Sequence, residues 1–295
     1  MKKIFAILAF IFTLAFGYEL NFEKFYDENI TNEQVNEYLD DLLAALEKNP
    51  NLINKETNEY NERIFSFFII NSKVGNTGKF DFERIEKILK FKPDLNYDMY
   101  RINNSSVLHM AIALGFDHEI KSGISEDEIL KLVKVLVKHG ADINAKELLA
   151  TAYSVNKFEI FRYLIDNGAR DTTRIMLSIA ADTAIFIGQN NLSIHRDKLE
   201  NSKEREFAKT QKFDKFYKER IRFLEKILKF QELKEIDSKE IELFILVNVI
   251  LDNDRAIELL LQHGLCELEN SYKFLKEQAK VYNSKKILKI INGLY

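Results

Sequence analysis

The chain has 295 residues, of which 46% are hydrophobic and 30% are charged, so it can bury a substantial core and is too apolar to be disordered. Its two prolines and ten glycines are few for this length, which excludes a turn-rich β protein and favours helices. The formal net charge of −3 comes from 46 acidic and 43 basic residues, a balance that gives no overall attraction to nucleic acid or anionic lipid.

The first 17 residues, MKKIFAILAFIFTLAFG, have the layout of a secretory signal peptide. Two lysines precede the apolar run Ile4–Phe16, and small residues flank a cleavage point that leaves Tyr18 as the first mature residue. A helix of this run is about 20 Å long, which is shorter than the roughly 30 Å hydrocarbon core of a membrane. We therefore expect a periplasmic or secreted protein without a stable membrane span. The alternative is a buried N-terminal helix of a cytosolic protein.

Asn29 begins the tripeptide Asn-Ile-Thr and follows Asp27 by two residues. This arrangement matches the extended N-glycosylation acceptor of bacterial oligosaccharyltransferases. The abundance of Lys, Asn, Ile and Phe and the absence of Trp also suit a bacterial source. Asn29 is therefore a predicted modification site; otherwise it is a neighbour of a helix cap at Thr31.

The phrase EKILKF occurs twice, at residues 86–91 and 225–230, and the related KKILKI runs from 285 to 290. Around these phrases the apolar positions recur at steps of three and four residues, which predicts amphipathic helices. Seven segments share this frame: 42–54, 84–96, 132–144, 160–171, 223–236, 256–268 and 285–295. In four of them a glycine follows the last turn and predicts a left-handed cap: Gly140, Gly168, Gly264 and Gly293.

Further helical segments lie between these, at residues 106–115, 148–157, 176–186 and 242–253. The repeating unit is thus a pair of helices. One pair cannot bury its own apolar stripe, so stacked copies must cover each other and place Leu or Ile in equivalent buried positions, such as Leu136 and Ile227.

Two short motifs identify the type of repeat. Residues 106–111 read Ser-Val-Leu-His-Met-Ala, and residues 139–145 read His-Gly-Ala-Asp-Ile-Asn-Ala. This chain resembles the ankyrin repeat, which opens with Thr-Pro-Leu-His-x-Ala and closes with a Gly-Ala-Asp-x-Asn turn, although the proline is missing here. The interval from Ile227 to Leu260 is the ankyrin period, whereas the other intervals are irregular.

The resemblance implies an all-α, ankyrin-like α-solenoid of stacked helix pairs with insertions and degenerate β-turn fingers. It implies a single repeat domain over residues 18–295, which is clearest over 105–168 and 224–270. Residues 117–128 and 189–222 are predicted insertions. The first is either a solvated loop that caps the next helix or a partner-contacting loop. The second holds basic and aromatic residues, which form either the buried stripe of one long helix or a nucleic-acid surface.

No motif of catalysis, metal binding or cofactor binding is recognisable. The five histidines form no HExxH or Cys/His ligand set, and a phosphate-binding loop and a nucleophile elbow are absent from the sequence. His109 is expected to form hydrogen bonds to neighbouring turns. We therefore predict a protein that is not an enzyme, without a catalytic residue, metal or cofactor.

Ankyrin-like proteins bind other proteins, so the resemblance implies a protein–protein interaction module, which we expect to be a monomer with no nucleic-acid partner. The longest finger, residues 96–104, predicts an exposed partner-binding patch at Tyr97, Asp98, Met99, Tyr100 and Arg101; the alternative is that two of its aromatic residues pack beneath the finger. An immunity or inhibitor protein that neutralises a co-secreted toxin is the alternative, and an enzyme with an unrecognised site is a third reading.

Overall fold

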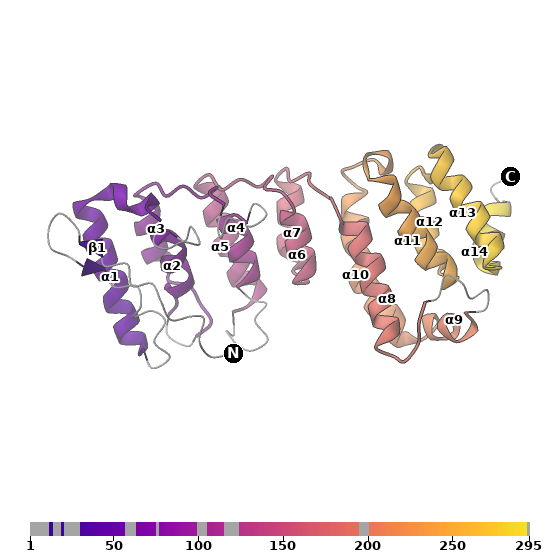
Figure 1. Ribbon diagram of the computed structural model, residues 1–295, viewed down its shortest axis with the longest axis horizontal. Coiled ribbons are helices and arrows are strands. Elements are labelled where there is room, and N and C mark those ends of the chain that lie inside the picture. Colours follow the sequence, from indigo (N-terminus) through magenta and orange to yellow (C-terminus); the bar gives the residue numbers. More distant parts are fainter. Residues whose placement is uncertain are drawn as a thin grey trace. The chain divides into compact units, whose positions relative to one another are not determined.

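The computed structural model describes residues 12–13, 19–20, 30–56, 63–74, 77–98, 105–114, 124–194 and 201–293. The chain divides into two compact units, Met1–Thr151 and Ala152–Tyr295, and each is described by itself. The described residues form fourteen α-helices, and their only strands are the antiparallel two-residue pair Phe12–Thr13 (β1) and Glu19–Leu20 (β2) (Figure 1). The predicted all-α class is therefore confirmed.

The N-terminal predictions concern residues that are mostly not described. The predicted signal peptide, residues 1–17, lies outside the described residues except for β1, and Asn29 also lies outside them. Within the described part of the chain, no helix is both long enough and apolar enough to cross a membrane.

The helices of the first unit alternate with turns and begin at polar caps. Thr31 forms a capping box with Gln34, and the Ser125 side chain accepts a hydrogen bond from the backbone N–H of Glu128. The elements are α1 (Asn32–Lys48), the 3₁₀ helix η2 (Pro50–Asn54), α2 (Ile64–Asn71), α3 (Phe82–Leu89), α4 (Val107–Ala113) and α5 (Glu126–Lys138). Helix α6 (Leu148–Ser154) spans the boundary between the units.

The helices of the second unit form two rows. Helix α11 packs on α8 and on α13, while α10 contacts α7 and α8, and α12 contacts α11 and α14. The elements are α7 (Phe158–Asp166), α8 (Ile175–Gly188), α9 (Ser202–Ala208), α10 (Gln211–Ile227), η3 (Leu233–Glu235), α11 (Ser238–Ile250), α12 (Asp254–Gln262), η4 (Leu265–Glu267), α13 (Glu269–Val281) and α14 (Lys285–Gly293).

Three helix pairs are joined by turns of the same form. Residues 155–157, 251–253 and 282–284 link α6 to α7, α11 to α12, and α13 to α14. The middle residue of each turn has a positive φ: Asn156, Asp252 and Asn283. The next residue donates its N–H to a carbonyl five residues earlier, a bond that closes the first helix of the pair. We call α4, α6, α8, α11 and α13 first helices, and α1, α3, α5, α7, α10, α12 and α14 second helices.

Both predicted insertions fall between the two helices of a pair, with bounds that differ from the prediction. Helix α5 already begins at Glu126, and α10 already begins at Gln211. The first connection, residues 114–125, is therefore as long as predicted but lies three residues earlier, and the second, residues 189–210, is shorter because residues 211–222 belong to the first turns of α10.

The glycine caps are confirmed at three of four positions. Gly140, Gly168 and Gly264 have φ values of 98°, 105° and 91°, the left-handed region in which glycine is least strained. Gly293 is instead the last residue of α14. After α3, Lys92 takes a left-handed conformation without being glycine, with φ of 54°.

The repeated phrase occupies equivalent places in three second helices. Its apolar residues Ile88 and Ile227 are buried, and Ile287 is buried in the related phrase. Lys87, which lies between the buried Ile85 and Ile88 on α3, keeps 55% of its side chain exposed. The phrase therefore recurs because the same buried positions recur.

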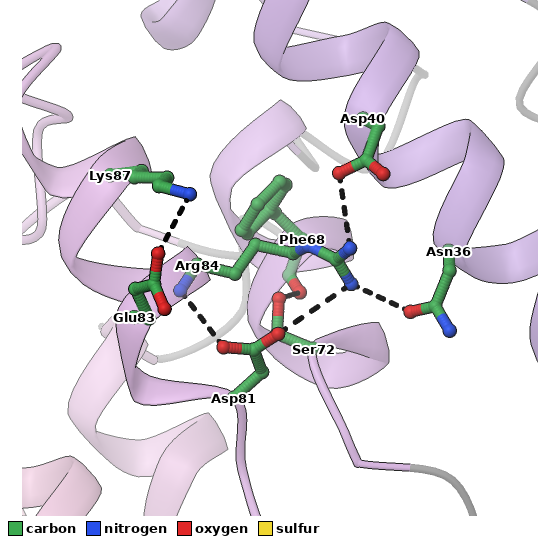
Figure 2. A network of polar contacts seen from close by, with 8 residues as sticks. All are labelled: Asn36, Asp40, Phe68, Ser72, Asp81, Glu83, Arg84 and Lys87. Carbon is green, nitrogen blue, oxygen red and sulfur yellow. Dashed lines mark hydrogen bonds and ion pairs between the residues drawn. The ribbon is translucent and has the colours of Figure 1, made fainter.

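Polar contacts join consecutive second helices in the first unit (Figure 2). Arg84 on α3 points toward α1, where it donates to Asn36 Oδ1 at 2.6 Å and pairs with Asp40 at 3.0 Å. Farther along, Glu86 Oε2 on α3 lies 2.9 Å from His139 Nε2, which caps the end of α5.

The second unit repeats this pattern. Ion pairs link α7 to α10, α10 to α12, and α12 to α14: Asp166–Lys226 at 2.5 Å, Glu225–Arg255 at 3.5 Å and Asp254–Lys286 at 3.3 Å. Each exposed pair adds only about 0–1 kcal/mol, so these contacts fix the register of the helices more than they stabilise them.

Candidate functional site

The first residue of the predicted finger patch, Tyr97, is buried rather than exposed. Tyr97 is 5% exposed, and the Arg63 guanidinium lies 4.1 Å from the centroid of its ring. Arg63 also pairs with Asp94 at 3.0 Å. At Tyr97 the exposed-patch prediction is therefore wrong and the alternative, an aromatic ring packed beneath the finger, holds, because Arg63 covers the ring. Asp98 is half-buried, and Met99, Tyr100 and Arg101 lie outside the described residues.

Asparagine side chains link the segment after α1, the turn after α3 and the turn after α5. Asn54 Oδ1 accepts the backbone N–H of Asp94, and Asn96 Oδ1 accepts that of Asp142, both at 2.7 Å. Asp94 and Asp142 each accept the N–H two residues later. In the motif Asp94-Leu95-Asn96 the aspartate closes its own turn and the asparagine joins that turn to the next one, so the motif is structural.

His109 behaves as the sequence predicts. Its Nδ1 accepts the backbone N–H of Ser106 at 3.0 Å, so the ring is protonated at Nε2, which lies 3.0 Å from Lys146 O. Burial lowers the pKa of His109, and the contacts with Lys146 and Glu147 oppose this shift in part. The residue therefore fastens the start of α4 to the turn before α6.

Helix α8 carries an exposed apolar stripe. Leu177 and Ile185 are 36% and 58% exposed, and the exposed Ala181 lies between them. Residues spaced by four lie on one face of a helix, so the three side chains form a continuous strip. The other faces of α8 pack against α10 and α11.

The neighbouring first helices differ at the same positions. The turns that end α8, α11 and α13 share one hydrogen-bond pattern, centred on Asn191, Asp252 and Asn283, which aligns the three helices. At the positions of Leu177, Ala181 and Ile185, α11 has Ser238, Glu242 and Leu246, and α13 has Glu269, Lys273 and Glu277. The apolar stripe is therefore a property of α8, not of the repeat.

The basic and aromatic segment is mainly a buried stripe, as the simpler prediction has it. Phe213, Tyr217 and Phe223 are buried along α10. Phe216 stacks on Phe186 of α8, with ring centroids 4.0 Å apart and planes at 4°. These rings hold α10 on its neighbours.

Arg205 fixes the short helix α9 over the ends of two first helices. Its Nε donates to Ile250 O at the end of α11, and its Nη atoms donate to Tyr282 O, Asn283 O and Ser284 Oγ after α13. Exposed carbonyls at helix ends need such donors. The insertion thus covers the turns of α11/α12 and α13/α14.

A pocket of about 550 Å³ lies beside α9. Its walls come from α9, the start of α10 and the two covered turns, and include Phe213, Leu251 and Tyr282. Tyr217 and Asn253 also line it, and both bond to the buried Asn248 Oδ1, at 2.9 and 2.8 Å.

The pocket wall is uncharged at Tyr217. Burial raises the pKa of this tyrosine, so its hydroxyl stays protonated at neutral pH and donates to Asn248. Across the described parts of the chain, no cluster of three or more His, Cys, Asp or Glu side chains is arranged to hold a metal ion.

Comparison of the chain with protein-family models, with curated proteins and with solved structures finds no match. Its function is therefore argued from its own residues.

Sequence analysis missed both the α8 stripe and the pocket beside α9. For the α8 stripe there was one weak sign, because the helix is apolar on nearly every side, which is more than one buried face requires. Nothing in the sequence indicated the role of Arg205, because its hydrogen-bond acceptors lie 45 to 79 residues away in the chain.

Proposed function

We propose that this chain is an exported protein-recognition module of the ankyrin-repeat type, which binds a partner protein in the periplasm or outside the cell through the row of first helices in its second unit. Support for the repeat type comes from helix pairs with recurring turns, left-handed glycine caps and linked Asp-x-Asn turns. The signal-peptide layout of residues 1–17 supports export.

The observation that carries the proposal is the apolar stripe of α8. Leu177 and Ile185 remain exposed, whereas α11 has Ser238 and the buried Leu246 at these two positions and α13 has Glu269 and Glu277. Burying a Leu or Ile side chain stabilises a complex by about 1.5–3 kcal/mol, and the charged neighbours then favour one partner over others. We infer that the partner presents an apolar segment to α8.

Photo-crosslinking in the native host tests this proposal. A benzophenone amino acid at Ile185 is expected to give one discrete crosslinked protein, whereas the same amino acid at the equivalent position of α13, Glu277, gives little of it. The crosslinked protein is then purified and titrated with Ile185→Lys and with the matched control Glu277→Lys.

We expect Ile185→Lys to weaken binding by about 1.5–3 kcal/mol, and Glu277→Lys to change it by less than about 0.5 kcal/mol. Circular dichroism must show both variants folded. If the two variants bind with equal strength, the stripe is not the contact surface.

A further inference from the structure

The pocket beside α9 has an uneven charge. Its lining includes five basic residues, Arg205, Lys209, Arg255, Lys285 and Lys286, and four acidic residues, Glu206, Asp214, Asp252 and Asp254. The charge of the ligand that fits depends on which of these side chains already form ion pairs within the protein, rather than on their number.

All four acidic residues already have partners. Glu206 pairs with Lys209 at 2.5 Å, Asp214 with Lys218 at 2.7 Å and Asp254 with Lys286 at 3.3 Å, while Asp252 accepts the backbone N–H of Lys286 at 3.1 Å. Among these four carboxylates only Asp252 has no ion pair within the described residues, so one negative charge of the pocket lining is not compensated.

Two cations have no carboxylate partner within the described residues. Arg205 donates only to neutral oxygens, so its positive charge is not compensated by an ion pair. One of its five N–H groups, on Nη1, is not used in these bonds. Lys285 at the start of α14 is exposed and also forms no ion pair with the described part of the chain.

Arg205 is the better positioned of the two cations to bind an anion. Arg205 is held in one orientation by four acceptors, so binding costs it little side-chain entropy. Hydrogen bonds from a cation to a carboxylate are roughly twice as strong as neutral ones. The walls at Phe213 and Leu251 limit water on one side, which strengthens the attraction.

We propose that this pocket binds a carboxylate of a polypeptide, received by Arg205 and Lys285. A pocket of about 550 Å³ is much larger than one carboxylate and accommodates the neighbouring peptide groups, for which Asn253 and Ser202 line the wall. The site contains no residue of the α8 stripe, so it is independent of the proposed recognition surface.

Fluorescence anisotropy of the mature chain tests the proposal with three labelled peptides. The first is Gly-Asp-Glu-Asp-Gly with an amidated C-terminus, the second replaces each acid by its amide, and the third has no acidic side chain but a free C-terminal carboxylate. The variants are Lys285→Glu and a matched control on the same helix, Lys289→Glu, whose exposed side chain lies outside the pocket.

We expect saturable binding of the acidic peptide, of the free-terminus peptide or of both, and none of the amide peptide. Lys285→Glu should weaken it by about tenfold or more, since it turns an attraction into a repulsion, while Lys289→Glu stays within about twofold. Which peptide binds identifies a side-chain or a terminal carboxylate. Absence of saturable binding by the wild-type chain, or equal loss in both variants, would overturn the proposal.

Discussion

Asn96 Oδ1 accepts a hydrogen bond from the backbone N–H of Asp142 at 2.7 Å, and Asn96 Nδ2 donates to Gly140 O at 3.0 Å. One side chain in the turn after α3 therefore satisfies two backbone groups in the turn after α5. The contact joins turns that are far apart in sequence, and it makes the asparagine a structural residue of the first unit.

Replacing this asparagine should loosen the first unit. We expect Asn96→Ala to lower the free energy of unfolding by about 1–3 kcal/mol, because each of two hydrogen bonds contributes about 0.5–1.5 kcal/mol. Asn51→Ala, at an exposed asparagine whose side chain forms no hydrogen bond to the described residues, should change it by less than about 0.5 kcal/mol. Urea denaturation followed by circular dichroism measures both; equal effects would contradict the structural role.

Lysine cannot replace arginine at position 205. Arg205→Lys keeps the charge but loses the planar guanidinium that reaches three carbonyls. We therefore expect the free energy of local unfolding of α9 to fall by about 1–3 kcal/mol. Hydrogen exchange of residues 202–208 should speed up, while the buried Leu260 on α12 keeps its protection. The control is Lys203→Arg, on the exposed side of α9, which should leave exchange unchanged.

The buried positions of second helices should be costly to truncate. Leu136→Ala and Ile227→Ala each remove a buried side chain, so each should cost about 2–5 kcal/mol. Lys134→Ala, on the exposed side of α5, should stay within about 0.5 kcal/mol. Thermal unfolding of the three variants tests which positions of the second helices are buried. If the lysine variant loses as much stability as the other two, the assignment of buried positions is wrong.

His109 should make stability depend on pH. Burial lowers the pKa of His109 in the folded chain below its unfolded value of about 6.5, so the unfolded chain binds the proton more readily. The stabilising contribution is complete above about pH 6.5 and is lost as the pH falls through the folded pKa, because a proton on Nδ1 displaces the N–H of Ser106. Urea titrations at pH 7.5 and 5.0 should show a smaller pH-dependent loss in His109→Gln than in the parent chain. An identical loss in both would assign it to other groups.

Export predicts a processed N-terminus. Terminal sequencing of the protein from its native host should give Tyr18, or a residue within two positions of it, because the small residues before it fit signal peptidase. An intact Met1 on the mature protein would rule out cleavage at this site.

Local chemistry let the sequence determine the helices of this protein. Apolar residues at steps of three and four predicted the second helices, and the caps at Gly140 and Gly168 followed from the φ values that glycine tolerates. The buried aromatic stripe of α10 was also predictable, because its spacing is set within one helix. The ankyrin resemblance, export and the single repeat domain stay predictions.

Only the tertiary structure decided what is exposed between the helices. Tyr97 looked like a surface anchor because the sequence does not show that Arg63 covers its ring, and the α8 stripe became distinct only once α10 and α11 had covered the other faces of α8. The pocket exists because Arg205 reaches carbonyls 45 and 77 residues away. Helical periodicity is a short-range property of the chain, whereas coverage and pocket walls depend on which distant segments meet.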